Sequence, residues 1–358
     1  MEKKEKHLTV TVPAYNAEAY LEKNVCSMLG AAHYLGGKEL SSLLEILIVD
    51  DGSTDGTPQL ADALCERFPG IIRVIHKENG GHGSGINTGI QSALGTYFKV
   101  IDADDWVDPE GFANLLMRLD ETDADIVYSN FYWARETGTP ETFHLKAELR
   151  EPFSGARYGV KYRFSEICEG LYIKMHSMTI RTELLRAQNR SIDEHCFYVD
   201  TEFVLFPIPL VRTILFLDRY VYMYRLGRSG QSMSPERMQR NEEQFERVLH
   251  RLLDFYTECG REVRSNAMEP EKLHYIANFL ARVYAGWVKI LLSYPASKGK
   301  KQKLQSRERE LRRDYPEIYH SNGNRAVELL RRSGYLLYPL ASGTLRLKNR
   351  IASIGRHG

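Results

Sequence analysis

Short apolar runs alternate with longer amphipathic segments through the first part of the chain. An apolar, β-branched run of about five residues predicts a buried strand, and apolar residues three and four apart predict a helix. The runs predict strands at 8–12, 43–49, 71–75, 97–101 and 125–129, with helices at 17–33, 57–68 and 84–94. Strands that alternate with helices of this length predict βαβ units in a mostly parallel sheet flanked by helices, an α/β fold.

The last third of the chain has a helical period throughout. Apolar residues recur three and four apart between Phe245 and Tyr256, and again between Ile276 and Leu291. A glycine often follows a helix, so Gly260 predicts the end of the first of these helices. We therefore expect a sheet-based domain over residues 1–232 and a helical C-terminal region with a basic tail over residues 233–358.

Composition is typical of a soluble globular protein, with 43% hydrophobic and 27% charged residues in a chain of 358. A net charge of +1 provides no overall attraction to nucleic acid. Five cysteines without a CxxC pair indicate a reducing compartment and neither a zinc site nor a disulfide framework. The chain has no signal-peptide pattern and no apolar run of about 18 residues, so we expect a cytoplasmic protein without a membrane span.

Basic residues are concentrated in two C-terminal segments. Residues 298–313 hold eight basic side chains and two acidic ones, and residues 334–358 hold basic side chains and no acidic one. Leucines mixed with cations in 334–358 suit peripheral contact with an anionic membrane surface at its inner face. A solvated surface helix is the alternative.

Three carboxylates, those of Asp102, Asp104 and Asp105, follow the predicted strand 97–101. Side chains alternate along an extended chain, so Asp102 and Asp104 are expected to project to one side. Mg²⁺ and Mn²⁺ prefer such oxygen ligands and commonly share them with substrate phosphates. The alternative is an acidic turn before a helix that begins at Asp108-Pro109-Glu110.

Polar residues also follow the three preceding strands. Tyr15 follows the first, Asp50 and Asp51 the second, and His82 the third. Ligands of open α/β sheets bind beyond the carboxyl ends of the strands, so these side chains predict a single site. The glycine-rich segment 80–89 lacks the third glycine of a dinucleotide fingerprint, which argues against a nicotinamide enzyme. Its amides could face a phosphate, or its glycines could serve only a tight turn.

Four segments in this order resemble the successive motifs of family 2 glycosyltransferases, which have the GT-A fold. They are VPAYNAE (12–18), ILIVDDGSTDGT (46–57), ENGGHGSGINTGI (78–90) and YFKVIDADDWVD (97–108). The resemblance covers residues 7–130 and continues more loosely to residue 230. It implies inverting transfer of a sugar from a nucleotide-diphosphate donor with the help of Mn²⁺ or Mg²⁺.

Carried over to this sequence, the resemblance implies a donor site. Pro13, Ala14 and Tyr15 would line the base pocket, and Asp50 would accept a hydrogen bond from the base, which favours uracil and therefore a UDP-sugar. Asp51 would support the loop or the ribose. The basic residue that many members carry before Asn87 is absent, so His82 or Lys77 is expected to contact the phosphates instead.

The same resemblance assigns the acidic turn to the metal. Asp102 would contact the ribose or the ion, Asp104 would bind the ion directly, and Asp105 would assist, with Ala103 in the donor-binding turn between them. Arg225 and Arg228, in the segment YMYRLGRSGQ (222–231), could pair with the pyrophosphate or belong to a surface turn.

The segment FYVDTEFVLFPI (197–208) partly resembles the family motif that carries the catalytic base, although Val199 stands where glutamate is usual. An inverting transfer needs a carboxylate that deprotonates the acceptor hydroxyl. Asp200 is the first candidate and Glu202 the second, and either could instead be a helix N-terminal acid. His176 could reach the acceptor or be structural.

The expected acceptor is a saccharide or a lipid-linked molecule in cell-surface polysaccharide or glycolipid synthesis, and the transferred sugar a hexosyl or N-acetylhexosaminyl group. Two alternatives stay open. A sugar-phosphate nucleotidyltransferase would carry a glycine-rich basic loop after the first strand, where this chain has PAYNAE. A catalytically silent sugar-nucleotide-binding subunit would bind nucleotide without turnover.

Overall fold

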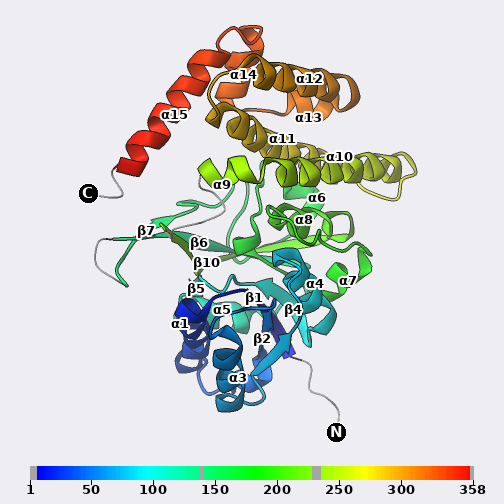
Figure 1. Cartoon of the computed structure of the whole chain (residues 1–358). Helices are drawn as coiled ribbons and strands as arrows, with labels where there is room; N and C mark the ends of the chain where they lie inside the picture. Colours follow the sequence, from blue (N-terminus) through cyan, green and yellow to red (C-terminus); the bar gives the residue numbers. More distant parts are fainter. Residues whose placement is uncertain (1–5, 138–140, 228–234, 355–358) are drawn as a thin grey trace. The chain divides into compact units, whose positions relative to one another are not determined.

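The computed structural model describes residues 6–137, 141–227 and 235–354. The chain divides into two compact units, Met1–Arg228 and Ser229–Gly358. The predicted boundary between residues 232 and 233 lies outside the described residues. Figure 1 shows the first unit as strands flanked by helices and the second as helices alone.

Four parallel strands in the order β3-β2-β1-β4 form the N-terminal half of the sheet. β2 is buried at every position, as expected of a strand covered on both faces. The strands are β1 Lys6–Ala14, β2 Leu44–Asp50, β3 Ile72–His76 and β4 Gly95–Val100. The helical segments between them are α1 Glu18–Leu29, η1 Gly30–Tyr34, α2 Leu40–Leu43, α3 Thr57–Arg67 and α4 His82–Ser92. Each predicted strand and helix in this half is therefore present, within a few residues of its predicted ends.

The other half of the sheet is mixed rather than parallel. The short strand β9 lies antiparallel between β4 and β6, while β10 runs parallel to β6. These strands are β5 Trp106–Val107, β6 Ile126–Glu136, β7 Phe143–Ala147, β8 Lys161–Arg163, β9 Met178–Arg181 and β10 Thr213–Leu226. The helical segments are α5 Pro109–Asp120, α6 Phe164–Ile167, η2 Met175–Ser177, α7 Thr182–Ala187, α8 Asp200–Leu205 and η3 Ile208–Leu210.

The second unit is a set of helices around α11 Pro270–Ser293, which buries Tyr275, Leu280 and Trp287. The other helices are α9 Pro235–Arg240, α10 Glu242–Arg264, α12 Lys298–Asp314, α13 Pro316–His320, α14 Arg325–Arg332 and α15 Tyr338–Ile354. The prediction that Gly260 ends α10 is wrong, because the helix continues to Arg264. A single glycine in a long amphipathic helix costs only about 1 kcal/mol, which the packed apolar face of α10 outweighs.

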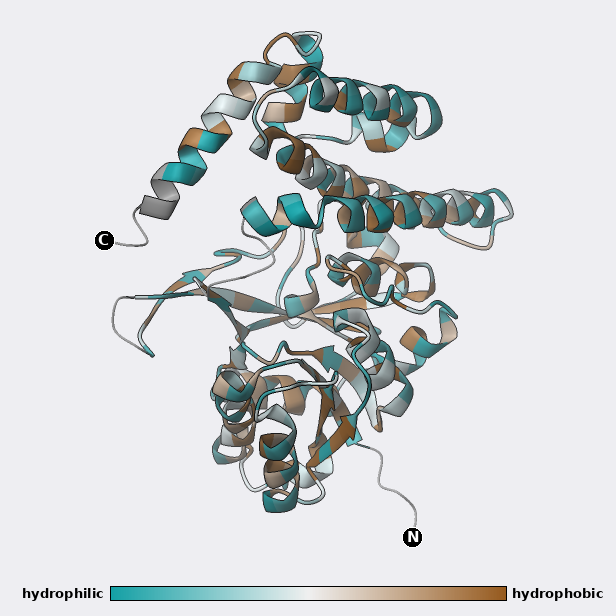
Figure 2. Cartoon of the chain, viewed as in Figure 1, coloured by the Kyte–Doolittle hydropathy of each residue, from teal (hydrophilic) through white to brown (hydrophobic). Residues whose placement is uncertain are grey.

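The helices of this unit differ in hydropathy, and Figure 2 shows that α12 is largely hydrophilic. Within the described residues, α11 alone is long and apolar enough to cross a membrane, with a mean hydropathy of 1.2 over its most apolar part. Of that part, 67% is buried inside the structure. Such burial is typical of a core helix, so α11 gives only weak support for a membrane span.

Candidate donor and catalytic site

The loops after β1 and β2 are joined by hydrogen bonds around Asn16. Its backbone N–H donates to the Ser53 hydroxyl at 3.0 Å, and its side-chain oxygen accepts from the Thr54 N–H at 2.8 Å. Asn16 has φ of 50°, a left-handed conformation that asparagine tolerates better than most residues. This geometry places Tyr15 at the carboxyl end of β1 with 52% of its surface exposed, while Ala14 is buried. Pro13 lies within β1 and pairs with Val49.

Asp50 is buried at the end of β2, and both of its carboxylate oxygens have partners. One accepts from the Ser53 N–H at 3.0 Å and the other lies 2.9 Å from His76 Nδ1. The carboxylate of Asp50, and then that of Asp62, raises the pKa of His76 by hydrogen bonding. Asp50 therefore holds the turn after β2 as well as lying where the nucleobase is expected.

Asp51 supports the glycine-rich loop. Its carboxylate accepts from the backbone N–H groups of Gly80 at 2.9 Å and Gly81 at 2.7 Å, and from Lys77 Nζ at 2.8 Å. Gly81 has φ of +83°, where a side chain would be strained. Lys77 is therefore paired with Asp51 beside the loop rather than extended toward open solvent.

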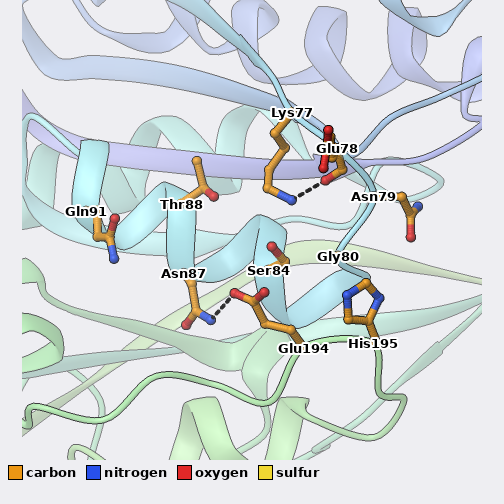
Figure 3. Close-up of a pocket in the computed structure, with 10 residues that line it drawn as sticks. All are labelled: Lys77, Glu78, Asn79, Gly80, Ser84, Asn87, Thr88, Gln91, Glu194 and His195. Atoms are coloured by element: carbon orange, nitrogen blue, oxygen red, sulfur yellow. Dashed lines mark hydrogen bonds between the residues drawn. The ribbon is translucent and has the colours of Figure 1, made fainter.

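A polar cavity of about 370 Å³ lies between this loop, α4 and the segment at Glu194 and His195 (Figure 3). Ser84 and Asn87 of α4 lie opposite Glu194 and His195, with Asn87 Nδ2 at 3.2 Å from the Glu194 carboxylate. Asn87 also exchanges two hydrogen bonds of 2.9 Å with the backbone of Ile192. Asn87 thus fixes the segment that leads into α8. The cavity is lined by Lys77, Glu78, Asn79, Gly80, Ser84, Asn87, Thr88, Gln91, Glu194 and His195.

The acidic segment after β4 is a turn, not the extended end of a strand. β4 stops at Val100, and the Asp105 N–H donates to the Asp102 carbonyl at 2.9 Å. The expectation of an extended chain at Asp102 and Asp104 is therefore wrong, and the two residues lie in a turn. Both side chains are partly exposed, while Ala103 and Asp105 are buried.

Three residues from distant parts of the chain hold this acidic turn. The buried Asn24 amide donates to the carbonyls of Asp102 at 3.0 Å and Asp105 at 2.9 Å. The Tyr222 hydroxyl accepts from the Asp102 N–H at 3.2 Å and donates to the Asp105 carboxylate at 2.5 Å. The backbone of Arg225 donates to the other Asp105 oxygen at 2.7 Å, and its Nε donates to the Asp104 carbonyl at 2.8 Å.

Arg225 and Asp105 are both buried at this turn. Arg225 is 4% exposed, and the rings of Tyr20, Trp106 and Phe143 lie about 5 Å from its guanidinium. The Arg225 guanidinium is thus packed against the backbone of the acidic turn. Arg228, the other predicted arginine, lies outside the described residues. Burial, with the nearby carboxylates of Asp104 and Asp102, raises the pKa of Asp105 well above its usual value.

His82, the first residue of α4, links the acidic turn to α8. Its Nε2 lies 2.8 Å from the Asp102 carboxylate. Burial opposes the charged form of His82, but the attraction of the Asp102 carboxylate is stronger, so the pKa of His82 is raised. The pKa of Asp102 is lowered, because His82 outweighs the effect of burial on that carboxyl. Asp200, the first residue of α8, contributes to the same shift. Burial raises the pKa of Asp200 itself, and His82 lowers it, so the three groups share one electrostatic environment.

Glu202 has a different environment from Asp200. Its side chain is fully buried, and one carboxylate oxygen accepts from the Asp193 N–H at 2.8 Å. The Asp193 carbonyl in turn lies so close to Gly83 that a Cβ there would meet it at 2.1 Å. Glu202 therefore fixes the segment before α8 against the start of α4.

One group in the described residues has the geometry of a metal site. Ligand atoms of Asp102, Asp105 and His176 lie within 4.8 Å of one another, and the Asp104 carboxylate is not in this group. His176 Nδ1 is buried and has no hydrogen-bond partner in the described structure. Carboxylate oxygens and a neutral imidazole suit Mn²⁺, so the residues present fit a divalent ion. The sequence pattern did not point to His176 as a ligand.

A buried lysine lies next to the segment that carries His176. Lys99 is fully buried in β4, and burial lowers its pKa to about 7. Its Nζ donates to the His176 carbonyl at 2.8 Å and the Met178 carbonyl at 3.3 Å, which fixes η2 beside the acidic turn. Burial also lowers the pKa of His176 to about 4, so its ring is neutral near pH 7. Sequence reasoning missed Lys99, although a lone lysine within the apolar run YFKVI is its signal.

Comparison of the sequence with known proteins identifies the family of this chain. The model of glycosyl transferase family 2 matches residues 9–188, half of the chain. The chain belongs to glycosyl transferase family 2. Glycosyltransferase EpsJ of Bacillus subtilis, described as uncharacterized, is 31% identical over 225 residues, which cover 61% of this chain and 60% of that protein. Glycosyltransferase GlyG of Streptococcus pneumoniae is 28% identical over 242 residues, which cover 64% of this chain and 73% of GlyG.

Solved structures support the fold of this family member. TarS residues 1–349 from S. aureus has a TM-score of 0.53 at 19% identity, covering 96% of this chain and 88% of the TarS chain. The same TarS fragment in complex with UDP-GlcNAc gives a TM-score of 0.53 at 18% identity, covering 96% and 89%. The predicted GT-A class, a sheet flanked by helices with a helical C-terminal extension, is confirmed.

Proposed function

We propose that this chain is an inverting, metal-dependent glycosyltransferase that transfers a sugar from a nucleotide-diphosphate donor to a hydroxyl of a saccharide or lipid-linked acceptor. The observation that carries the proposal is the acidic turn, which Asn24, Tyr222 and Arg225 hold beside Asp200. This arrangement brings candidate metal ligands and a candidate base to the same edge of the sheet, where α/β folds bind ligands.

On the donor side, the exposed ring of Tyr15 is the candidate to stack on the nucleobase. Asp50 is the candidate acceptor for a base N–H, and UDP is the preferred nucleotide. The complex of TarS with UDP-GlcNAc supports a UDP-sugar by analogy of fold. His82 is the candidate cation for the phosphates, because its raised pKa favours the imidazolium form.

Asp102, Asp105 and His176 would hold a divalent ion, with Asp104 beside them on the same turn. When bound, such an ion would neutralise the charge that develops on the pyrophosphate leaving group. Asn24 and Tyr222 fix the backbone of the turn, so the carboxylates are oriented before any ligand arrives.

Asp200 is the candidate base for the acceptor hydroxyl. A base is most effective when its pKa lies closer to the working pH, and the pKa of Asp200 is raised by burial. Glu202 is the less favoured candidate, because its carboxylate is fully buried beneath the segment before α8.

Calorimetry would test the donor part of the proposal. The intact protein would be titrated with UDP, GDP and CDP, each with and without Mn²⁺. We expect UDP to bind more tightly than the others and only with the ion. Failure of every nucleotide to bind would reject the proposal, and nucleotide binding without turnover across many acceptors would favour a silent binding subunit.

We also propose that α15 contacts an anionic membrane from the cytoplasmic side. Tyr338 and Ser342 pin its inner face through hydrogen bonds to the Leu291 and Tyr294 carbonyls. On the opposite face, Leu340 is 66% exposed and Leu347 is 60% exposed. Arg346, Lys348 and Arg350 lie within three residues of Leu347 in the sequence, and residues 334–358 contain no acidic residue. Exposed leucines flanked by cations suit the interface of an anionic bilayer.

Vesicle flotation at low salt would test this contact. The protein should float with phosphatidylglycerol vesicles and not with phosphatidylcholine vesicles, and Leu340→Glu with Leu347→Glu should abolish flotation. Equal behaviour of the wild type and this double variant would exclude α15 as the membrane contact.

A further inference from the structure

A second cavity, of about 210 Å³, lies within the helical unit, among α12, α13 and α14. Its lining contains three arginines and one glutamate, so positive charge dominates. The lining residues are Gln305, Glu308, Arg309, Arg312, Tyr319, Arg331 and Tyr335.

The floor of this cavity is a rigid, neutralised ion pair. Arg331 donates to the buried Glu308 carboxylate from Nε at 2.7 Å and from a terminal nitrogen at 3.2 Å. The hydroxyls of Tyr284 and Tyr335 donate to the same carboxylate at 2.7 and 3.0 Å. The Arg331 guanidinium also lies 3.7 Å from the centre of the Tyr319 ring and donates to the Tyr319 carbonyl. Glu308 is therefore satisfied by its own partners.

Among the described residues, the two remaining arginines of the cavity form no ion pair. Arg309 and Arg312 are exposed, whereas Lys300, Lys303 and Arg307 of the same helix are each paired with a glutamate. Residues three apart on a helix are neighbours, about 5–6 Å between Cβ atoms. Two guanidinium groups at this separation can each grip two oxygens of one tetrahedral anion.

The backbone beside the cavity is also unusual. Tyr335 has φ of 64°, a left-handed conformation that is costly for a bulky residue. Its N–H donates to the Leu330 carbonyl at 2.8 Å, and its hydroxyl reaches Glu308, so the strained turn holds the ring over the cavity. Strain of this kind persists where the surrounding structure fixes it, and it often marks a binding site.

We propose that this cavity binds a phosphate group, with Arg309 and Arg312 gripping its oxygens and Arg331 with Tyr335 forming a rigid wall. The site shares no residue with the proposed donor site and goes beyond the proposed transfer reaction. Its ligand is a phosphate ester, either soluble or in a lipid headgroup. Two arginines of the basic segment 298–313, Arg309 and Arg312, would thus bind phosphate.

Titration of the full-length protein with inorganic pyrophosphate tests the proposal. Metal is removed with a chelator and ionic strength is held constant, so that ion-assisted binding at the donor site does not contribute. Arg309→Gln with Arg312→Gln is compared with Lys298→Gln with Lys301→Gln, which removes the same charge from α12 outside the cavity. We expect the arginine variant to bind at least about tenfold more weakly and the lysine variant to match the wild type. Equal weakening in both variants, or no saturable binding, would overturn the proposal.

Two further titrations identify the source of the phosphate. Glycerol phosphate represents a soluble ester, and phosphatidylglycerol vesicles represent a headgroup, with phosphatidylcholine vesicles as the neutral control. Both variants keep α15, so its contribution cancels. A loss confined to the arginine variant with either probe supports the site and assigns its ligand, whereas no loss with either probe contradicts it.

Discussion

The two acidic turns at the edge of the sheet differ in what their carboxylates do. After β2, the carboxylate of Asp51 accepts from two backbone N–H groups of the glycine-rich loop and from Lys77. After β4, the backbone of the turn is held from outside by Asn24 and Tyr222, and the Asp102 carboxylate lies 2.8 Å from His82.

The difference separates a scaffold carboxylate, that of Asp51, from a candidate ligand carboxylate, that of Asp102. A carboxylate that accepts several backbone hydrogen bonds stabilises its loop and has little capacity left for a ligand. A turn whose backbone is fixed by other residues can keep neighbouring carboxylates close together despite their repulsion. Both turns are acidic, DDG and DADD, and the residues that contact them differ.

The largest expected effect concerns the base that faces the turn after β4. Asp200→Asn should lower the transfer rate by about 10³-fold, because the amide cannot accept the acceptor proton. Nucleotide affinity, measured by calorimetry, should be unchanged. Glu202→Gln is the matched control. If Asp200→Asn is active while Glu202→Gln is folded but inactive, Glu202 is the base instead of Asp200.

The second effect separates the two turns directly. Asp51→Asn should lower the free energy of unfolding by about 3 kcal/mol, because Lys77 and the N–H groups of the glycine loop lose a buried anionic partner. Asp102→Asn should destabilise the protein less and remove the metal-dependent part of nucleotide binding. Denaturant unfolding and calorimetry would measure both quantities. The comparison fails if Asp102→Asn is the more destabilised variant and still binds nucleotide with the ion.

A smaller effect is expected from the residue that holds the turn after β4. Asn24→Ala leaves the carbonyls of Asp102 and Asp105 without its two hydrogen bonds and should cost about 2 kcal/mol of stability. It should also weaken Mn²⁺-dependent nucleotide binding. Asn114→Ala is the control, because Asn114 bonds only within its own helix among the contacts described. Equal effects of the two substitutions on metal dependence would show that Asn24 does not position the turn.

The smallest expected effect is on the pH profile of kcat/KM. Asp200 acts as a base only when ionised, so activity should fall as the pH drops through its pKa, which burial raises above the usual value. His82 lowers that pKa, so His82→Gln should move the acidic limb to higher pH. His76→Gln, which removes a histidine paired with Asp50 and Asp62, should leave the limb in place. A shift to lower pH in His82→Gln would contradict the assignment.

Local patterns predicted much of the fold and part of the site. The cap at Asp108 is correct, since its carboxylate accepts from the Gly111 N–H at 2.7 Å, a contact within one turn. Asn24 and Tyr222 were missed because they reach the Asp102 backbone from 78 and 120 residues away. No local pattern encodes such contacts. The turn at Asp102 was predicted as extended because alternation of side chains holds only while the strand continues.

The position of β9 has a consequence for synthesis of the chain. Its four residues fill the gap between β4 and β6, and Tyr222 and Arg225 arrive later still on β10. During synthesis β4 and β6 leave the ribosome before β9 and β10, so the edges of β4 and β6 that will pair with these strands are still unpaired. Exposed edges are templates for pairing with other chains. A fragment that ends at residue 188, where the family match ends, would contain β9 but lack β10, and it should aggregate rather than form the acidic turn.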